Sequence, residues 1–157
     1  MKHFDRAMIV AIYSLAAMGT NLLAQSQSDE IELTRAVIQA QRQAIVADNL
    51  GLTDEEGQRF WPLYRQYRND LAKNGDRKVA VITTFADNYH NLSEGTADWM
   101  VNEFLAIAKV DAEVKSRWVP RFREVLPAKK VALFVQLENK LDAIINYDLA
   151  ESIPLVH

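Results

Sequence analysis

The 157-residue chain contains no cysteine, and it is poor in glycine and proline, with five and four residues. Without cysteine the protein has no disulfide, no thiolate nucleophile and no lipid-modified cysteine as an anchor. With so few residues that favour turns, the chain has few places at which a long element can end. Its stability must therefore come from packing between long segments.

Histidine is also rare, at positions 3, 90 and 157. No nucleophile has a histidine placed to activate it, and no glycine-rich loop is present to hold a phosphate. Asp87 and His90 have a spacing that metal ligands use, but a third ligand is missing, so a metal-binding protein is only the third hypothesis. We therefore expect a protein that is not an enzyme and that requires no cofactor and no metal.

Residues 1–24 have the composition of a secretory signal peptide. Two basic side chains precede an apolar run at 7–17, and small and polar residues follow. The run is shorter than the roughly 20 residues of a membrane-spanning helix. We expect cleavage near Ala24, with Ala17-x-Gly19 as the second candidate, then a periplasmic protein without stable membrane insertion.

Residues 25–157 are expected to form a single mature domain. Removal of 1–24 changes the formal net charge from −3 to −4, so no overall basic character indicates a nucleic-acid partner. Long helical hairpins bury little surface per residue, and a homodimer is therefore one expected assembly.

The segment at 52–71 has the pattern of a helix opening followed by an apolar stripe. Thr53 and Glu56 have the spacing of a capping box. Four side chains then recur at steps of three and four: Phe60, Leu63, Tyr67 and Leu71. A partial copy follows 74 positions later, at Leu126, Phe134, Leu137, Leu141 and Ile145.

The same periodicity predicts an all-α fold of four helices, at 29–48, 53–89, 93–125 and 127–152. We expect the second and third to form a long kinked antiparallel hairpin, with a shorter helix at each end. In the third helix, six residues are expected to face inward: Met100, Phe104, Ile107, Val114, Trp118 and Phe122.

Two features interrupt the pattern at 53–89. Pro62 removes one backbone donor inside the helix, and Asn74-Gly75 is a pair typical of turns. Two alternatives follow: one kinked long helix, or two helices separated at Asn74-Gly75.

In an antiparallel hairpin that turns near residue 91, residue i faces roughly residue 182 minus i. This pairing places Phe60 opposite Phe122 and Tyr64 opposite Trp118. The aromatic residues then gather at the end of the hairpin away from the turn. They are either core packing between the two helices or a partly exposed binding surface.

Basic residues concentrate around the same aromatic residues. Six Lys or Arg stand against two Asp at 59–78, and six against one Glu at 115–130. Such runs are either solvated helix faces or a surface for an acidic partner. The candidate polypeptide-binding residues are Phe60, Trp61, Tyr64, Arg65, Arg68, Arg117, Trp118, Arg121 and Phe122.

The two helix openings, Leu52-Thr53-Asp54-Glu55-Glu56 and Leu126-Pro127-Ala128-Lys129-Lys130, resemble the repeated motif of the LTxxQ-motif (Spy/CpxP-like) periplasmic helical proteins. The FWPLY and VLPAKK segments are similar to those of a closer group of uncharacterised exported helical proteins. The LTxxQ resemblance implies a thin helical hairpin dimer that acts as an ATP-independent chaperone or docks onto a stress sensor.

We therefore expect a chaperone-like or envelope-stress adaptor protein that binds unfolded or partner polypeptide through a basic and aromatic helical surface. The alternative is a passive structural or adaptor module with one dedicated protein partner and no chaperone activity.

Overall fold

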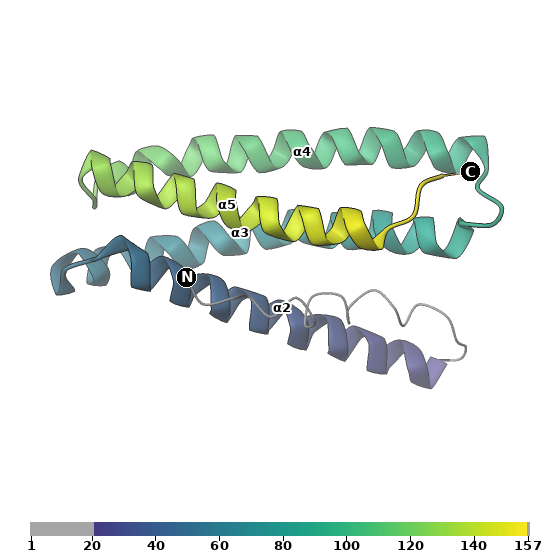
Figure 1. Cartoon of the computed structure of the whole chain (residues 1–157), viewed down its shortest axis with the longest axis horizontal. Helices are drawn as coiled ribbons and strands as arrows, with labels where there is room; N and C mark the ends of the chain where they lie inside the picture. Colours follow the sequence, from purple (N-terminus) through teal and green to yellow (C-terminus); the bar gives the residue numbers. More distant parts are fainter. Residues whose placement is uncertain (1–20, 157) are drawn as a thin grey trace. The chain divides into compact units, whose positions relative to one another are not determined.

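The computed structural model describes residues 21–156, and these form four helices and no strand (Figure 1). The helices are α2 (Asn21–Leu50), α3 (Asp54–Asn88), α4 (Glu94–Arg123) and α5 (Ala128–Ser152). The predicted all-α fold is confirmed. The predicted signal peptide lies outside the described residues, except for its last four positions, which belong to α2.

The first turn of α3 is held by the predicted capping box. The Thr53 hydroxyl accepts a hydrogen bond from the Glu56 amide at 3.2 Å, and the Glu56 carboxylate accepts one from the Thr53 amide at 2.9 Å. Three acidic side chains in this turn also face the positive end of the helix dipole. From there α3 continues for 35 residues without a break. One long helix is therefore correct, and a division at Asn74-Gly75 is wrong.

The other helix ends follow from short local signals. Gly51 ends α2 with a φ of +55°, a left-handed conformation that costs little only for glycine. The Ser93 hydroxyl accepts from the Thr96 amide at 3.1 Å and caps α4. The start of α2 at Asn21 differs from the predicted start at 29, because neither glycine nor proline interrupts 21–50.

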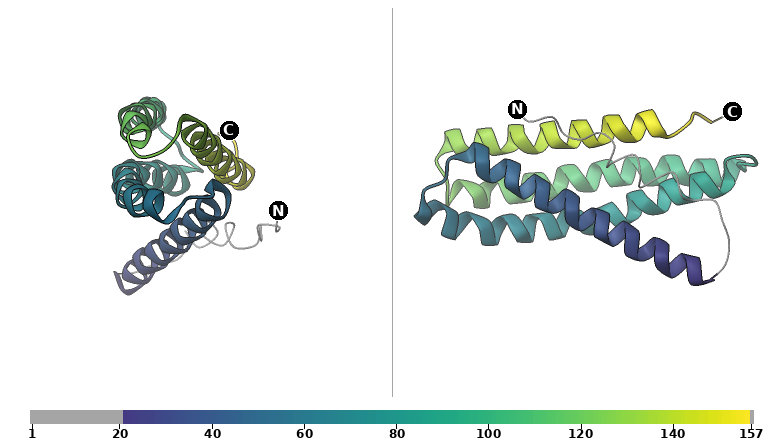
Figure 2. Two further views of the ribbon diagram at one scale, coloured as in Figure 1. Left: turned by 90° about the vertical axis from the view of Figure 1, so that its left-hand side faces the viewer. Right: turned by 60° about the horizontal axis from the view of Figure 1, so that its bottom comes forward.

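The chain divides into two compact units, of which the second is the contiguous segment Leu52–Ala132. In this unit α3 and α4 run antiparallel, side by side along their length (Figures 1 and 2). Three contacts between the helices agree closely with the predicted pairing of residue i with residue 182 minus i. They join Phe60 to Phe122, Asn74 to Ile107 and Arg77 to Glu103.

The core of this unit consists of the inward faces of α3 and α4 and the start of α5. Its buried apolar members are Phe60, Tyr64, Tyr67, Phe85, Ile107, Val114, Trp118, Phe122, Leu126 and Val131. The predicted inward position of Phe104 is wrong, since its side chain is 65% exposed. Phe104 lies three residues before Ile107, which rotates it about 60° out of the α3-facing stripe.

Among the described residues, the other unit combines 21–51 with 133–156. Here the Arg42 guanidinium of α2 donates to Glu138 at 3.0 Å and to Asp142 at 2.5 Å, both on α5. Arg42 and Glu138 are buried. The buried apolar residues of this unit are Val46, Leu50, Phe134 and Leu141.

Candidate functional site

Aromatic rings of α3 and α4 form a continuous cluster at the end of the hairpin away from its turn. We call Phe60, Trp61, Tyr64, Tyr67, Trp118 and Phe122 the aromatic cluster. The predicted Phe60–Phe122 pair is present, with ring centroids 5.5 Å apart. Trp118 packs on Tyr67 at 6.3 Å. Tyr67 is nearer the turn than the predicted Tyr64, as expected because helix side chains lean toward the N-terminus of their helix.

Burial separates the members of the aromatic cluster. Phe60 and Phe122 are completely buried, and Tyr64 and Trp118 are 2% and 3% exposed. Trp61 is half-buried. Four of the predicted binding aromatics are therefore core residues, and among the predicted aromatic candidates only Trp61 presents substantial ring surface to solvent.

Asp70 on α3 connects the buried cluster to the basic side chains at the surface. Its carboxylate accepts hydrogen bonds from the Trp118 indole at 2.9 Å and from Arg117 at 3.3 Å, and it pairs with Lys73 at 3.4 Å. The Trp118 hydrogen bond, followed by Lys73 and Arg117, lowers the pKa of Asp70 despite partial burial. Asp70 is therefore a fixed negative charge at neutral pH.

A second polar layer crosses the hairpin one turn further along α3. The buried Asn74 amide donates to the Ile107 carbonyl and to Asp111, both at 2.8 Å. Arg77 binds both oxygens of Glu103, at 2.5 and 2.9 Å, and its hydrogen bonds lower the pKa of Glu103. These contacts fix the register of the two helices and hold the charges in place.

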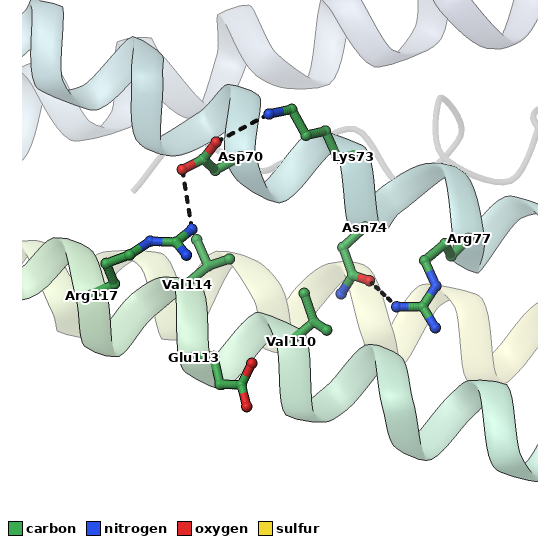
Figure 3. Close-up of a pocket in the computed structure, with 8 residues that line it drawn as sticks. All are labelled: Asp70, Lys73, Asn74, Arg77, Val110, Glu113, Val114 and Arg117. Carbon is green, nitrogen blue, oxygen red and sulfur yellow. Dashed lines mark hydrogen bonds and ion pairs between the residues drawn. The ribbon is translucent and has the colours of Figure 1, made fainter.

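An open pocket of about 280 Å³ lies between α3 and α4, and residues of both polar layers line it (Figure 3). It is lined by Asp70, Lys73, Asn74, Arg77, Val110, Glu113, Val114 and Arg117. We call it the α3–α4 groove. Valine side chains supply its apolar part, while three cations and two carboxylates supply the charge.

The α3–α4 groove places charges of both signs beside apolar side chains. Its lining contains no hydroxyl, thiol or imidazole group. The lowered pKa of Asp70 leaves that carboxyl without a proton to donate at neutral pH. Fixed charges of both signs beside an apolar floor can instead contact charged and apolar side chains of another molecule.

The arginines predicted for the site do not all lie on one surface. Arg117 lines the α3–α4 groove. Arg65 and Arg68 stand about 140° and 160° around the α3 axis from Asp70, and Trp61 stands about 180° from it. Arg117 therefore lies at the groove, whereas Trp61, Arg65 and Arg68 lie on the side of α3 that faces away from the groove.

Arg121 stays near the groove, one turn along α4 from Arg117. Its guanidinium lies 4.5 Å from the centre of the Trp118 ring, the geometry of a cation–π contact, and the residue is exposed. Among the described residues, neither Arg121 nor Arg65 has an ion pair.

Asp70 and Asn74 shape the groove, but neither is among the site residues predicted from the sequence. A signal was available for Asn74, because it continues the seven-residue spacing of the buried Phe60 and Tyr67. An asparagine on a buried heptad position is typical of a register-fixing contact between helices. No pattern in the sequence marks Asp70 as the acceptor of the Trp118 indole.

Within 21–156, no three His, Cys, Asp or Glu side chains are grouped to hold a metal ion. No helix in this part of the chain is long and apolar enough to cross a membrane. Comparison with known proteins finds no matching family model, no matching curated protein and no matching solved structure.

Proposed function

We propose that this chain is a non-enzymatic polypeptide-binding protein, chaperone-like or an envelope-stress adaptor, which works without ATP. The observation that carries the proposal is the α3–α4 groove, where fixed charges of both signs border an apolar floor. Arg117 and Arg121 extend this surface toward the aromatic cluster. The groove, rather than the whole predicted set of aromatics, is the proposed contact surface.

The composition of the groove favours weak and reversible binding. Lys73 is 79% exposed and Arg117 is 56% exposed, so each exchanges its present carboxylate contact at small cost. A bound polypeptide would place its own carboxylates on these cations and its apolar side chains on the half-buried Val110. Contacts of this kind speed association and permit release without an energy source.

Suppression of aggregation tests the proposal. Light scattering of a reduced, aggregating client protein is followed at low salt with and without an equal amount of this protein. We expect suppression by the native chain and substantial loss of it in an Arg117→Gln/Arg121→Gln variant. No suppression by the native chain at stoichiometric amounts contradicts the proposal.

A matched control removes the same charge elsewhere in the same unit. Arg123 and Lys129 are exposed and form no ion pair among the described residues, and neither lines the groove. An Arg123→Gln/Lys129→Gln variant should retain the suppression. Equal loss in both variants would indicate an effect of total charge and would contradict a role for the groove.

The second candidate function is a passive structural or adaptor module with one dedicated partner. It is favoured by the burial of Phe60, Tyr64, Trp118 and Phe122, which serve as core. Titration of several unrelated unfolded clients separates the two functions. Binding to none of them, together with stoichiometric binding to a single folded protein, supports the module.

We also propose that the protein is exported to the periplasm and cleaved near Ala24. The support is the charge and apolar pattern of residues 1–24. The mass of the protein purified from a periplasmic fraction should correspond to a chain that begins at Gln25. A full-length mass in the cytoplasmic fraction contradicts this proposal.

A further inference from the structure

Helix α4 carries a row of apolar side chains, all exposed except the half-buried Ala97, on a face turned away from α3. Val101, Phe104 and Leu105 are 59%, 65% and 59% exposed. The row consists of Ala97, Val101, Phe104, Leu105, Ala108 and Ala112, and we call it the α4 stripe. Its centre lies about 110° around the helix axis from the core-facing Ile107.

The spacing within the α4 stripe is symmetric. Glu94 and Lys115 lie on the same face, one at each end, and the steps from Glu94 to Lys115 are 3, 4, 3, 1, 3, 4 and 3 residues. The steps read the same in both directions. A second copy of α4, placed antiparallel, therefore presents Leu105 to Phe104, Ala108 to Val101 and Ala112 to Ala97.

The charges beside the stripe complement each other under the same pairing. Glu94 of one copy meets Lys115 of the other at the ends of the stripe. Asp98 and Lys109 lie on the same edge of the stripe, and Lys109 is 78% exposed. In the antiparallel pairing, Asp98 of one copy lies opposite position 111 of the other copy, two residues from Lys109. The antiparallel arrangement also aligns the two helix dipoles favourably.

We propose that the α4 stripe is the interface of a homodimer, with the two-fold axis passing between Phe104 and Leu105. An isologous interface must be complementary to itself, and the spacing and the charges of the stripe both meet that condition. Alanine on both sides of the central pair lets the helix axes approach to within about 8–10 Å. The proposal is independent of the polypeptide-binding function.

Analytical ultracentrifugation over a range of concentrations tests the interface. The native chain should be a dimer, and Phe104→Glu should weaken dimerisation at least about tenfold, which is 1.4 kcal/mol. Circular dichroism should show the same helix content, because Phe104 is exposed. A native chain that stays monomeric at every concentration overturns the proposal.

Trp99→Glu is the matched control, because Trp99 is 42% exposed on the same helix but about 140° around it from Phe104. This variant should dimerise as the native chain does. If Trp99→Glu weakens the dimer as much as Phe104→Glu does, the interface is not the α4 stripe and the proposal fails.

Cysteine cross-linking tests the antiparallel register, and the absence of native cysteine removes any background. Position 101 faces position 108 of the second copy, whereas two residues at 101 are about 10 Å apart along the axis, beyond disulfide reach. A mixture of Val101→Cys and Ala108→Cys chains should therefore form mixed disulfides faster than either variant forms its own. Faster disulfides between identical variants, or none in the mixture, overturn the register.

A charge exchange gives a further test of the same register. Asp98→Lys and Lys109→Glu each place like charges beside each other in a homodimer and should weaken it. A mixture of the two variants restores opposite charges at both contacts and should prefer the heterodimer. Absence of that preference contradicts the proposed pairing.

Discussion

Asn74 is a buried polar side chain that joins the two long helices of the hairpin. Its amide group donates to the Ile107 carbonyl and to Asp111, and its oxygen accepts from Arg77 at 3.3 Å. The side chain is 2% exposed, so water cannot replace these hydrogen bonds in the folded state. Loss of buried donors is costly, because their partners must then be satisfied in another way.

We expect Asn74→Ala to lower the free energy of unfolding by about 1–3 kcal/mol, from the lost hydrogen bonds and the space left in the core. Urea denaturation followed by circular dichroism measures the change. Asn69→Ala is the control, because Asn69 is exposed on the same helix and should change stability by less than about 0.5 kcal/mol. Equal effects of the two substitutions would show that the Asn74 contacts are unimportant.

Gly75 is a helical residue with open space where a side chain would project. No heavy atom lies within 4 Å of an added Cβ, and φ is not positive there. We expect Gly75→Ala to raise the melting temperature, with a gain of about 0.4–1 kcal/mol, because alanine loses less backbone entropy in a helix.

Gly51→Ala is the opposite case, since φ is +55° at the end of α2, and it should destabilise the protein. Differential scanning calorimetry of both variants measures the two effects. A destabilising Gly75→Ala would indicate that α3 turns at this position.

At the scale of the helix, local patterns predict where most elements begin and end. Thr53 and Glu56, Ser93 and Gly51 act through side chains or dihedral angles within one turn, so the sequence contains their whole signal. The continuity of α3 through Asn74-Gly75 depends instead on α4, which supplies the hydrogen-bond partners of Asn74. A contact 33 residues away overrides a local preference for a turn.

The candidate site was less predictable than the helices for a similar reason. Helical periodicity locates residues on a face, and it correctly brought Phe60 to Phe122. It does not decide on which side of the hairpin a flanking cation projects, and Arg65 and Arg117 consequently lie on different sides. The α3–α4 groove depends on Asp70, whose carboxylate accepts a hydrogen bond from the Trp118 indole of the other helix.

Helix α2 is joined to α5 through a buried charge. Arg42 and Glu138 are both 3% exposed at their side chains, and Asp142 is 32% exposed. Removal of one partner from a buried ion pair leaves the other as an uncompensated charge.

We expect Arg42→Met to lower the free energy of unfolding by about 3–5 kcal/mol. Arg42→Met/Glu138→Met should recover most of that loss, because the buried carboxylate is then gone. Guanidinium denaturation of both single variants and the double variant gives the coupling energy. Additive effects of the two substitutions would contradict direct coupling.

At the scale of the molecule, three ionised carboxyls support the folded state of the segment Leu52–Ala132. Lys130 and the Thr53 amide lower the pKa of Glu56, the Trp118 indole lowers that of Asp70, and Arg77 lowers that of Glu103. A carboxyl whose pKa is lower in the folded state contributes stability above its unfolded pKa. That contribution disappears as the pH falls through the folded pKa.

We therefore expect the free energy of unfolding to be nearly constant from pH 7 to about 5 and to fall below about 4.5, the ordinary pKa of glutamate. Urea denaturation at several pH values measures this profile. A Glu56→Gln/Asp70→Asn/Glu103→Gln variant should be less stable at pH 7 and lose less on acidification. An unchanged slope in that variant would contradict the assignment.

The ion pair between Glu56 and Lys130, 2.5 Å apart, shortens the length of chain that must be closed when α2 meets α5. Arg42 and Glu138 are 96 residues apart in the sequence. Once α3 and α4 have paired and Glu56 meets Lys130, the path between Arg42 and Glu138 shortens to about 22 residues, which lowers the cost of loop closure by about 1 kcal/mol. We therefore expect the hairpin to form first and the contact between Arg42 and Glu138 to form after it.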